Sequence, residues 1–328
     1  MEDLIKGINE KGYIENKSDS EINFQEEIHK LRKEKNAIIL AHYYVDGEIQ
    51  DIADFVGDSL ALSQKAASTE ADIIVFVGVH FMAETAKILS PEKKVIIPDL
   101  NAGCSLADSC PADDFEEFIK KHSDHTVISY VNTSAAVKAL TDIVCTSTNA
   151  VKIVESIPED KNIIFGPDKN LGNYISRVTG RKMVIWDGAC HVHNEFSLEG
   201  ILEQKKLTPN AKIIAHPECP KQILLISDFI GSTSALINFT KTDKSKNFIV
   251  VTEPGVIHEM KKRSPEKFFI PAAAEDSECA CSECEFMKMN SIEKLYSCLK
   301  YELPEITIDE EIRKKAYKPI KAMLDLSI

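Results

Sequence analysis

The stretch Ala37-Ile38-Ile39-Leu40-Ala41 is an unbroken apolar run that ends in the polar sequence His42-Tyr43-Tyr44. A short apolar run of this kind predicts a strand buried on both faces, which is typical of a parallel sheet. A helical segment follows, then Asp54-Phe55-Val56-Gly57-Asp58-Ser59 and another helical segment. This alternation of strands and helices predicts an α/β fold.

The same order of features occurs three times along the chain. Val127-Ile128-Ser129-Tyr130-Val131-Asn132 and Ile213-Ile214-Ala215-His216-Pro217-Glu218 are the counterparts of the first strand. In each repeat two further apolar strands follow, and a cysteine comes beyond the last of them, at Cys104, Cys190 and Cys284. Self-similarity at a long period indicates repeated supersecondary units. We therefore predict three similar αβα units with small parallel sheets, packed around a pseudo-threefold axis with the active site at the centre.

The repeats suggest how the chain divides into domains. We expect a loose N-terminal extension over residues 1–21 and α/β units over residues 22–110, 111–193 and 194–289. Residues 290–328 are predicted to form charged helices that pack back on the first unit. Ligands of parallel sheets bind beyond the carboxyl ends of the strands, so the polar residues at those ends are expected to converge.

The composition is that of an ordinary globular protein and narrows the kinds of partner. A chain of 328 residues is long enough for two or three domains. The formal net charge of −13 argues against nucleic acid or an anionic membrane as a partner, but is compatible with a small anionic substrate. No apolar run approaches the ~20 residues that span a bilayer, and the N-terminus lacks the layout of a secretory signal. We therefore expect a cytoplasmic protein with reduced cysteines.

Cysteines are concentrated in the loop Cys279-Ala-Cys281-Ser-Glu-Cys284. Thiolates this close together are typical ligands of zinc or of iron–sulfur clusters. A structural zinc site prefers four closed ligands, whereas three cysteines from three loops suit a [4Fe–4S] cluster that keeps one iron open as a Lewis acid. The alternative is that Cys104 and Cys190 are ordinary buried residues. Their equivalent positions in the repeats favour a metal centre.

Hydroxyl-bearing residues occur where a loop enters a helix in each repeat, in the stretches Gly57-Asp58-Ser59, Cys145-Thr146-Ser147 and Gly231-Ser232-Thr233. Unpaired backbone N–H groups at such positions bind phosphate or carboxylate. Each stretch taken alone is more simply an N-cap. Three at matching positions predict an anion site.

Several residues near the strand ends could move protons or donate hydrogen bonds. A single histidine is more often a packed residue than a catalyst, whereas a carboxylate such as Glu218 beside a metal site is costly unless it is used. Histidine, tyrosine and buried glutamate can be tuned toward neutral pH. The predicted group consists of His42, Tyr44, Tyr130, Asn132, His193, His216 and Glu218.

A set of specific motifs makes the chain, from about residue 22 onward, closely resemble the quinolinate synthase family. The motifs are Ala41-His42-Tyr43-Tyr44, Gly57-Asp58-Ser59, Val79-His80-Phe81-Met82-Ala83-Glu84-Thr85, Ala102-Gly103-Cys104-Ser105, Tyr130-Val131-Asn132-Thr133, His216-Pro217-Glu218-Cys219 and Met287-Lys288-Met289-Asn290. The resemblance implies three α/β domains around a [4Fe–4S] cluster, in an iron–sulfur enzyme of NAD biosynthesis. It also implies condensation of iminoaspartate with dihydroxyacetone phosphate to quinolinate, with loss of phosphate and two waters.

The resemblance further implies a role for each motif residue. Cys104, Cys190 and Cys284 correspond to the cluster ligands. The main acid–base groups would be Tyr44 and Glu218. The other catalytic groups would be His42, Tyr130 and His193, and the substrate would be held by His42, Ser59, Tyr130, Asn132, Ser147, His193, His216, Glu218, Ser232 and Thr233.

Some positions depart from the family pattern. Thr148 stands where a second serine is usual, and Glu285 where a proline often follows the ligand cysteine. Cys279 and Cys281 are either idle or able to form a reversible disulfide. Neither departure, at Thr148 or at Glu285, removes a group that the chemistry needs.

Two rival interpretations are weaker. Another hydro-lyase with an open-iron cluster would need no phosphate cradle, and a redox sensor would need no convergent acid–base groups. The labile imine must come from an oxidase or dehydrogenase that acts on aspartate, so we expect transient contact with that enzyme.

Overall fold

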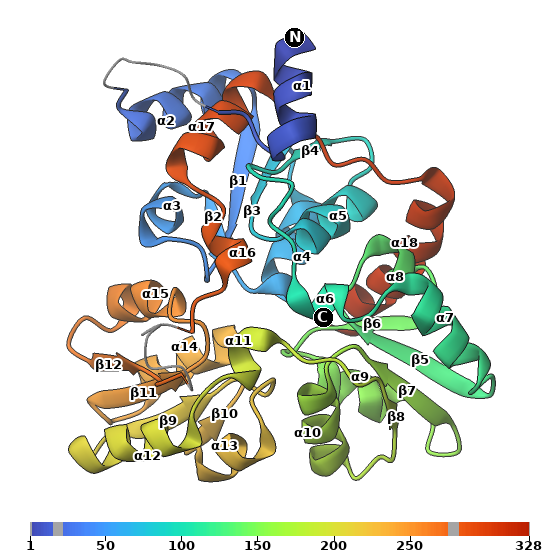
Figure 1. Cartoon of the computed structure of the whole chain (residues 1–328), viewed down its shortest axis with the longest axis vertical. Helices are drawn as coiled ribbons and strands as arrows, with labels where there is room; N and C mark the ends of the chain where they lie inside the picture. Colours follow the sequence, from blue (N-terminus) through green and yellow to red (C-terminus); the bar gives the residue numbers. More distant parts are fainter. Residues whose placement is uncertain (1, 16–21, 275–281, 328) are drawn as a thin grey trace.

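The computed structural model describes residues 2–15, 22–274 and 282–327. Its strands form three four-stranded sheets that are parallel throughout, and all three have the same strand order, in which the first strand lies between the second and the third. Figure 1 shows the sheets as three lobes around a common centre. This confirms the predicted fold class. The strands are, in the first sheet, β1 (Ala37–His42), β2 (Phe55–Gly57), β3 (Ile73–Val77) and β4 (Lys94–Ile96); in the second, β5 (His125–Tyr130), β6 (Ile143–Cys145), β7 (Asn162–Gly166) and β8 (Val184–Ile185); in the third, β9 (Lys212–Ala215), β10 (Phe229–Ile230), β11 (Asn247–Val251) and β12 (Phe268–Pro271).

The helices repeat as regularly as the strands. In each lobe one helix precedes the first strand, one follows each of the first three strands, and a short helix follows the fourth. The first lobe has α2 (Phe24–Glu34), α3 (Gly47–Ile52), α4 (Ser59–Ser68), α5 (His80–Leu89) and α6 (Ser105–Asp108). The second has α7 (Ala112–Lys120), α8 (Ala135–Lys138), α9 (Ala150–Ser156), α10 (Lys169–Thr179) and α11 (His191–Asn194). The third has α12 (Leu198–Leu207), α13 (Lys221–Ile226), α14 (Thr233–Thr242), α15 (Val256–Arg263) and α16 (Glu285–Lys288).

Both faces of each sheet are buried, as the continuous apolar runs predicted. In the second lobe Val127 and Ile164 pack in a cluster with Phe115 on one face. Their neighbours Ile128 and Phe165 point to the opposite face and join a core that extends into the first lobe. Successive residues of a strand alternate between faces, so a strand covered on both sides needs apolar residues at every position.

The second strand of each sheet is very short, and the sequence did not predict it. β2, β6 and β10 occupy the middle stretches, which we expected to be loops. An aspartate at the start of each stretch holds it beside the first strand. Asp54, Asp142 and Asp228 accept a hydrogen bond from the backbone N–H of Ile39, Val127 and Ile213 at 2.9, 2.8 and 2.8 Å, and each donates its own N–H to the carbonyl of the same residue. These paired bonds fix the register of each edge strand.

Helices near both ends of the chain contact the lobes. The N-terminal extension forms α1 (Glu2–Lys11), where the weak sequence pattern led us to expect a loose segment. Leu100 donates its N–H to the carbonyl of Gly12 at 2.9 Å, so the extension is attached beside the loop that leads to Cys104.

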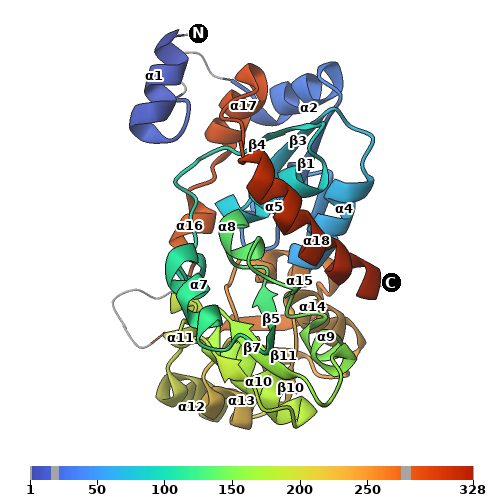
Figure 2. The same cartoon turned by 90° about the vertical axis from the view of Figure 1, so that its right-hand side faces the viewer.

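The C-terminal segment contributes α17 (Ile292–Tyr301) and α18 (Glu310–Leu326). α17 packs on α2 of the first lobe, whereas α18 contacts both α5 of the first lobe and α8 and β6 of the second. Figure 2 shows α18 crossing this junction. The predicted unit boundaries stay predictions.

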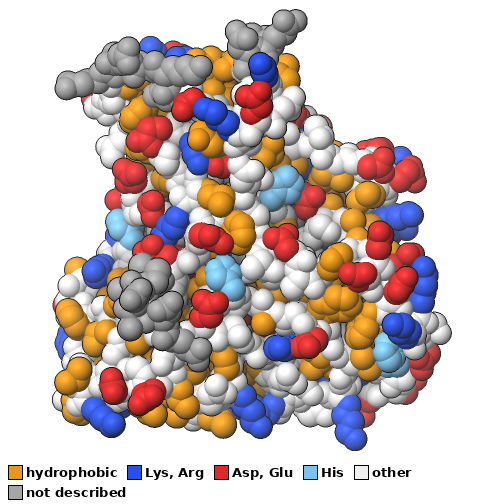
Figure 3. Space-filling view, viewed as in Figure 1, with side chains coloured by type: hydrophobic (Ala, Val, Ile, Leu, Met, Phe, Trp, Pro, Cys, Tyr) orange, Lys and Arg blue, Asp and Glu red, His pale blue; other side chains and the backbone are white. Residues whose placement is uncertain are grey.

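The charges on the surface and the lengths of the helices are the features that concern binding to nucleic acid or to a membrane. On the face seen in Figure 3, acidic and basic side chains are mixed over all three lobes. Within the described ranges, no helix is long and apolar enough to cross a membrane. The predicted cytoplasmic location stays a prediction.

The aspartate that ties β10 to β9 gives a test of the repeated edge-strand bond. Asp228→Ala should lower the free energy of unfolding by about 1–2 kcal/mol, because it removes a charge-assisted hydrogen bond to the Ile213 N–H at a partly exposed site. Asp228→Asn keeps an acceptor oxygen and should recover about half of that loss. The measurement is the urea midpoint of the full chain. Asp160→Ala, at an exposed loop position, is the control, and an equal midpoint for the two alanine variants would contradict the role of Asp228.

Candidate active site

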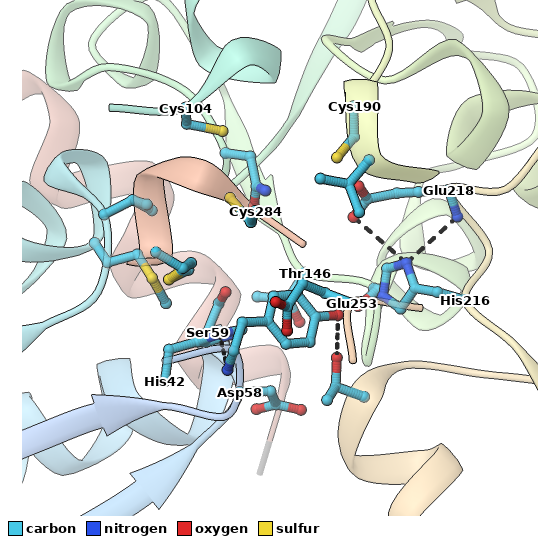
Figure 4. A pocket seen from close by; sticks show the side chains of 18 of the residues that line it. His42, Asp58, Ser59, Cys104, Thr146, Cys190, His216, Glu218, Glu253 and Cys284 are labelled. Atoms are coloured by element: carbon cyan, nitrogen blue, oxygen red, sulfur yellow. Dashed lines mark hydrogen bonds and ion pairs between the residues drawn. The ribbon is translucent and has the colours of Figure 1, made fainter. Parts of the chain in front are cut away.

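A pocket lies where the carboxyl ends of the three sheets meet, and its empty space, including the part open to solvent, is about 660 Å³. Figure 4 shows the three predicted ligand cysteines toward one end of it, with Asp58 and Ser59 toward the other. The structure brings together here every predicted site residue except Ser232: His42, Tyr44, Ser59, Cys104, Tyr130, Asn132, Ser147, Cys190, His193, His216, Glu218, Thr233 and Cys284. The convergence predicted from the repeat is therefore observed, while the role of each residue stays a prediction.

The three cysteines occupy equivalent positions in the fold. Cys104, Cys190 and Cys284 are the N-cap residues of the short helices α6, α11 and α16, each of which follows the last strand of its lobe. Backbone N–H groups of these helices donate hydrogen bonds toward the thiol sulfurs. Such bonds favour the thiolate form of a cysteine, and they influence the reduction potential of an iron–sulfur cluster bound to it.

The pocket disfavours the ionised form of a cysteine that has no metal bound to it. Burial raises the pKa of Cys104 to about 12 and that of Cys284 to about 11, and the pKa of Cys190 rises well above its usual value. The negative charge of an ionised Cys284 adds to the rise in the pKa of Cys104. A positively charged metal centre would remove this penalty. Three soft ligands from three loops, each with backbone donors, fit the [4Fe–4S] cluster that the sequence predicts.

Two buried carboxyl groups that the sequence analysis did not select hold the cysteine loops in place. Asp168 accepts a hydrogen bond from the backbone N–H of Cys190 at 3.2 Å and caps α10 by accepting from Leu171. Glu253 accepts from the backbone N–H of Gly255 at 2.7 Å and from that of Cys284. Both acids follow the third strand of their lobes. They fix the backbone that carries Cys190 and Cys284.

Glu218 is the centre of a hydrogen-bond network that joins the lobes. Its Oε1 accepts from Tyr130 Oη at 2.6 Å and lies 3.5 Å from His216 Nδ1. Its Oε2 lies 3.2 Å from His193 Nδ1. His216 Nε2 is 3.1 Å from Ser147 Oγ, which carries the network into the second lobe. A carboxylate that is 3% exposed is tolerated because its oxygens are paired in this way.

Tyr44 connects the first lobe to the same network through Thr252. The Tyr44 hydroxyl lies 2.8 Å from Thr233 Oγ1 and 2.8 Å from Thr252 Oγ1. Thr252 Oγ1 lies 2.9 Å from His193 Nε2. The sequence analysis missed Thr252 because nothing in its local sequence distinguishes it from an ordinary strand-end threonine.

Burial sets the protonation of these groups. It lowers the pKa of His42 to about 4 and that of His216 to about 3, so both rings are neutral near pH 7. Burial raises the pKa of Tyr44 and Tyr130 well above the usual value, so both phenols keep their protons. Burial also opposes ionisation of Glu218, but its histidine neighbours and Tyr130 outweigh this and lower its pKa to about 2. The neutral state of His216 means that it acts at neutral pH as a hydrogen-bond partner rather than as a charge.

The opposite part of the pocket contains the predicted anion site. Ser59 and Thr233 are the first residues of α4 and α14, and both line the pocket. Ser232 does not line it, because its hydroxyl caps α14 by accepting from the N–H of Ala235. Ser147 lies in the turn before α9. The plain N-cap interpretation therefore holds for Ser232, while its neighbour Thr233 faces the pocket.

Contacts across the lobes support this region. Asp58 caps α4 through the N–H of Ala61 and also accepts from Thr148 Oγ1 at 3.0 Å. Thr148, a departure from the family pattern, thus ties the second lobe to the first. Asn132 Oδ1 is buried without a hydrogen-bond partner in the described part of the chain, which leaves it available to a ligand.

The fold and the pocket together define an α/β enzyme class of three repeated units with a candidate active site at the centre. The family described as Quinolinate synthetase A protein matches residues 26–325. A quinolinate synthase of Thermosynechococcus vestitus is 58% identical over 300 residues, which cover 92% of this chain and 94% of that protein. The quinolinate synthases of Synechocystis sp. and Chloroherpeton thalassium are 59% and 54% identical over 300 and 308 residues, covering 92% and 94% of this chain and 94% and 96% of theirs. The chain belongs to the quinolinate synthase family, which confirms the resemblance seen in its motifs.

Lys294 joins two of the three cysteine loops and offers a test of how the pocket is held together. Its Nζ lies 2.5 Å from Asp99 Oδ2, in the loop before Cys104, and 2.8 Å from the carbonyl of Met289, just beyond α16. Asp99 is 2% exposed. Lys294→Met should lower the free energy of unfolding by about 2–4 kcal/mol, because it removes the counter-ion of this buried carboxylate and leaves it only the hydrogen bond from the Asn101 N–H.

The matched control is Lys318→Met, which removes the charge of an exposed lysine on α18. Thermal unfolding gives the stability, and hydrogen exchange should show faster exchange in residues 99–110 and 284–290 of the Lys294 variant only. Equal exchange in both variants would mean that Lys294 does not hold the two loops.

Proposed function

We propose that the protein is a quinolinate synthase that condenses iminoaspartate with dihydroxyacetone phosphate and releases quinolinate, phosphate and two waters. The observation that carries this proposal is the convergence of three thiols, a paired carboxylate and neutral acid–base groups in one buried pocket. Atoms balance in this reaction without an oxidant or a reductant, so the pocket needs ligands and proton carriers only.

The cysteines would hold the cofactor. Cys104, Cys190 and Cys284 fit a [4Fe–4S] cluster through their sulfurs, with Asp168 and Glu253 fixing the backbone of the latter two. When bound, a cluster with three cysteine ligands supplies one iron as a Lewis acid for the loss of hydroxyl groups as water.

The remaining side chains would bind the substrates and move protons. The N–H groups at the starts of α4 and α14, with the hydroxyls of Ser59, Thr233 and Ser147, suit carboxylate and phosphate groups. Asn132 and the neutral rings of His42 and His216 supply further donors and acceptors. They would orient the two substrates for carbon–carbon bond formation while the pocket excludes water.

Proton transfer falls to groups at the centre of the network. Tyr44 keeps its phenol proton at neutral pH and can donate it from Oη, while the Glu218 carboxylate can accept a proton at Oε2. His193 lies between them through Thr252 and can pass a proton from one side to the other. Tyr130 donates to Glu218 Oε1 and orients that carboxylate.

Activity is tested with the full-length protein under anaerobic conditions. Protein that contains a full complement of iron and sulfide is expected to form quinolinate from iminoaspartate and dihydroxyacetone phosphate, with one phosphate released per quinolinate. Absence of quinolinate from such protein would overturn the proposal. Protein stripped of iron is the control and should be inactive.

The assignment of cluster ligands has a separate test that does not depend on activity. Cys104→Ala, Cys190→Ala and Cys284→Ala should each lose most of the iron, the sulfide and the visible absorbance of the cluster, because each removes one of three ligands. Cys279→Ala changes a thiol of the same loop as Cys284 and should keep them; Cys279 and Cys281 lie outside the described residues. Loss of the absorbance in Cys279→Ala, with retention in Cys284→Ala, would show that the loop uses a different ligand.

A further inference from the structure

A group of three metal-binding side chains lies on one side of the pocket. The ligand atoms of Cys190, His193 and Glu218 all lie within 4.8 Å of one another. His193 Nδ1 is 3.3 Å from Cys190 Sγ and 3.2 Å from Glu218 Oε2. Figure 4 shows Cys190 and Glu218 close together in the pocket. Only Cys190 is also one of the three predicted cluster ligands. The three residues therefore form a second set of potential metal ligands in the same pocket.

The side chains around this group are arranged as the outer shell of a metal site. His193 Nε2 lies 2.9 Å from Thr252 Oγ1, so a ring that carries its proton on Nε2 presents Nδ1 as an unprotonated ligand. Tyr130 Oη donates to Glu218 Oε1 and leaves Oε2 toward His193 and Cys190. Each of these two ligands therefore has a partner that fixes its orientation, as ligands of real metal sites do.

The spacing and the chemistry suit zinc. Zinc bonds of about 2.0–2.3 Å in a tetrahedron place neighbouring ligand atoms about 3.3–3.8 Å apart. The two separations from His193 Nδ1, 3.3 Å to Cys190 Sγ and 3.2 Å to Glu218 Oε2, are close to that edge, and the sulfur and the carboxylate lie within 4.8 Å of each other. One thiolate, one imidazole and one carboxylate form a mixed set that zinc accepts, and the fourth position would open into the pocket.

We propose that the cluster-free protein binds one Zn²⁺ through Cys190 Sγ, His193 Nδ1 and Glu218 Oε2, and that this ion excludes the [4Fe–4S] cluster. Zinc binding depends only on the geometry of these three residues. The exclusion rests on the proposed function, since it requires Cys190 to be a cluster ligand. An ion that takes Cys190 leaves only Cys104 and Cys284 for the cluster.

The binding test titrates cluster-free full-length protein with Zn²⁺ against a chromophoric chelator. Circular dichroism first checks that each variant is folded. We expect one Zn²⁺ per chain, with affinity reduced at least tenfold in His193→Ala and Glu218→Gln and less than threefold in Cys104→Ala and Cys284→Ala. Thr252→Val keeps all three ligands and should weaken binding about 10-fold or more by releasing the His193 ring. Co²⁺ in place of Zn²⁺ should give the charge-transfer absorption of a single thiolate.

Two outcomes would overturn the zinc site. The first is no stoichiometric binding by folded wild-type protein. The second is loss of affinity in Cys104→Ala and Cys284→Ala equal to that in His193→Ala, which would place the ion on the three thiols.

The exclusion is tested by adding one equivalent of Zn²⁺ before iron and sulfide. Cluster incorporation should fall at least tenfold in the wild type, measured as bound iron and sulfide, and should be little changed in His193→Ala, which keeps all three cysteines. Equal incorporation in the wild type with and without Zn²⁺ would overturn the exclusion. If no cluster forms even without Zn²⁺, the proposed function fails while the zinc measurements stand.

Discussion

In a parallel sheet all strands end at the same edge, so the polar loops that follow them collect along one side. The three sheets here share one strand order and direct these edges toward a common centre. The loops after the first strands therefore bring Tyr44, Tyr130 and Glu218 together, and the loops after the last strands bring the three cysteines. Residues far apart in the sequence meet because their positions in the repeat are equivalent. The sheets themselves supply apolar burial and no chemistry.

Glu218 shows what this convergence demands of the fold. A carboxylate buried among three lobes is stable only if other groups pair with both of its oxygens. Tyr130 and His193 come from the second lobe and His216 from the third, while Thr252 extends the network to Tyr44 in the first. The proposed acid–base groups are thus also contacts that hold the lobes together. A change that moves one lobe would leave a buried polar group unpaired, so the site and the arrangement of the lobes are specified jointly.

Sequence patterns predicted the features that depend on the repeat and missed those that depend on single tertiary contacts. The apolar runs and the spacing of Cys104, Cys190 and Cys284 were sufficient for the fold class and for the position of the pocket. The edge strands β2, β6 and β10 contain only two or three residues, too few for a pattern to show, and they depend on aspartate bonds to another strand. Asp168, Glu253 and Thr252 act through partners in distant loops, and α1 is held in place beside the Cys104 loop. A single sequence carries no local sign of such contacts, although the two acids at equivalent strand ends could have been found by aligning the three repeats.

The proposed anion site differs from many others in that its described lining supplies no cation. Among the described residues that line it there is no lysine or arginine, although the proposed substrates carry carboxylates and a phosphate. A lysine placed here would lose its hydration and would pair with Glu218 or Glu253; Lys138, buried outside the pocket, illustrates the cost, since burial lowers its pKa to about 8. The N-terminal ends of α4 and α14 attract anions without this loss of charge. Their backbone N–H groups carry partial positive charge that no neighbouring carboxylate can neutralise by proton transfer. Neutral histidines and hydroxyls add directional donors at little electrostatic cost. Recognition by dipoles in this way would leave the ionised Glu218 carboxylate available for the proposed proton transfer.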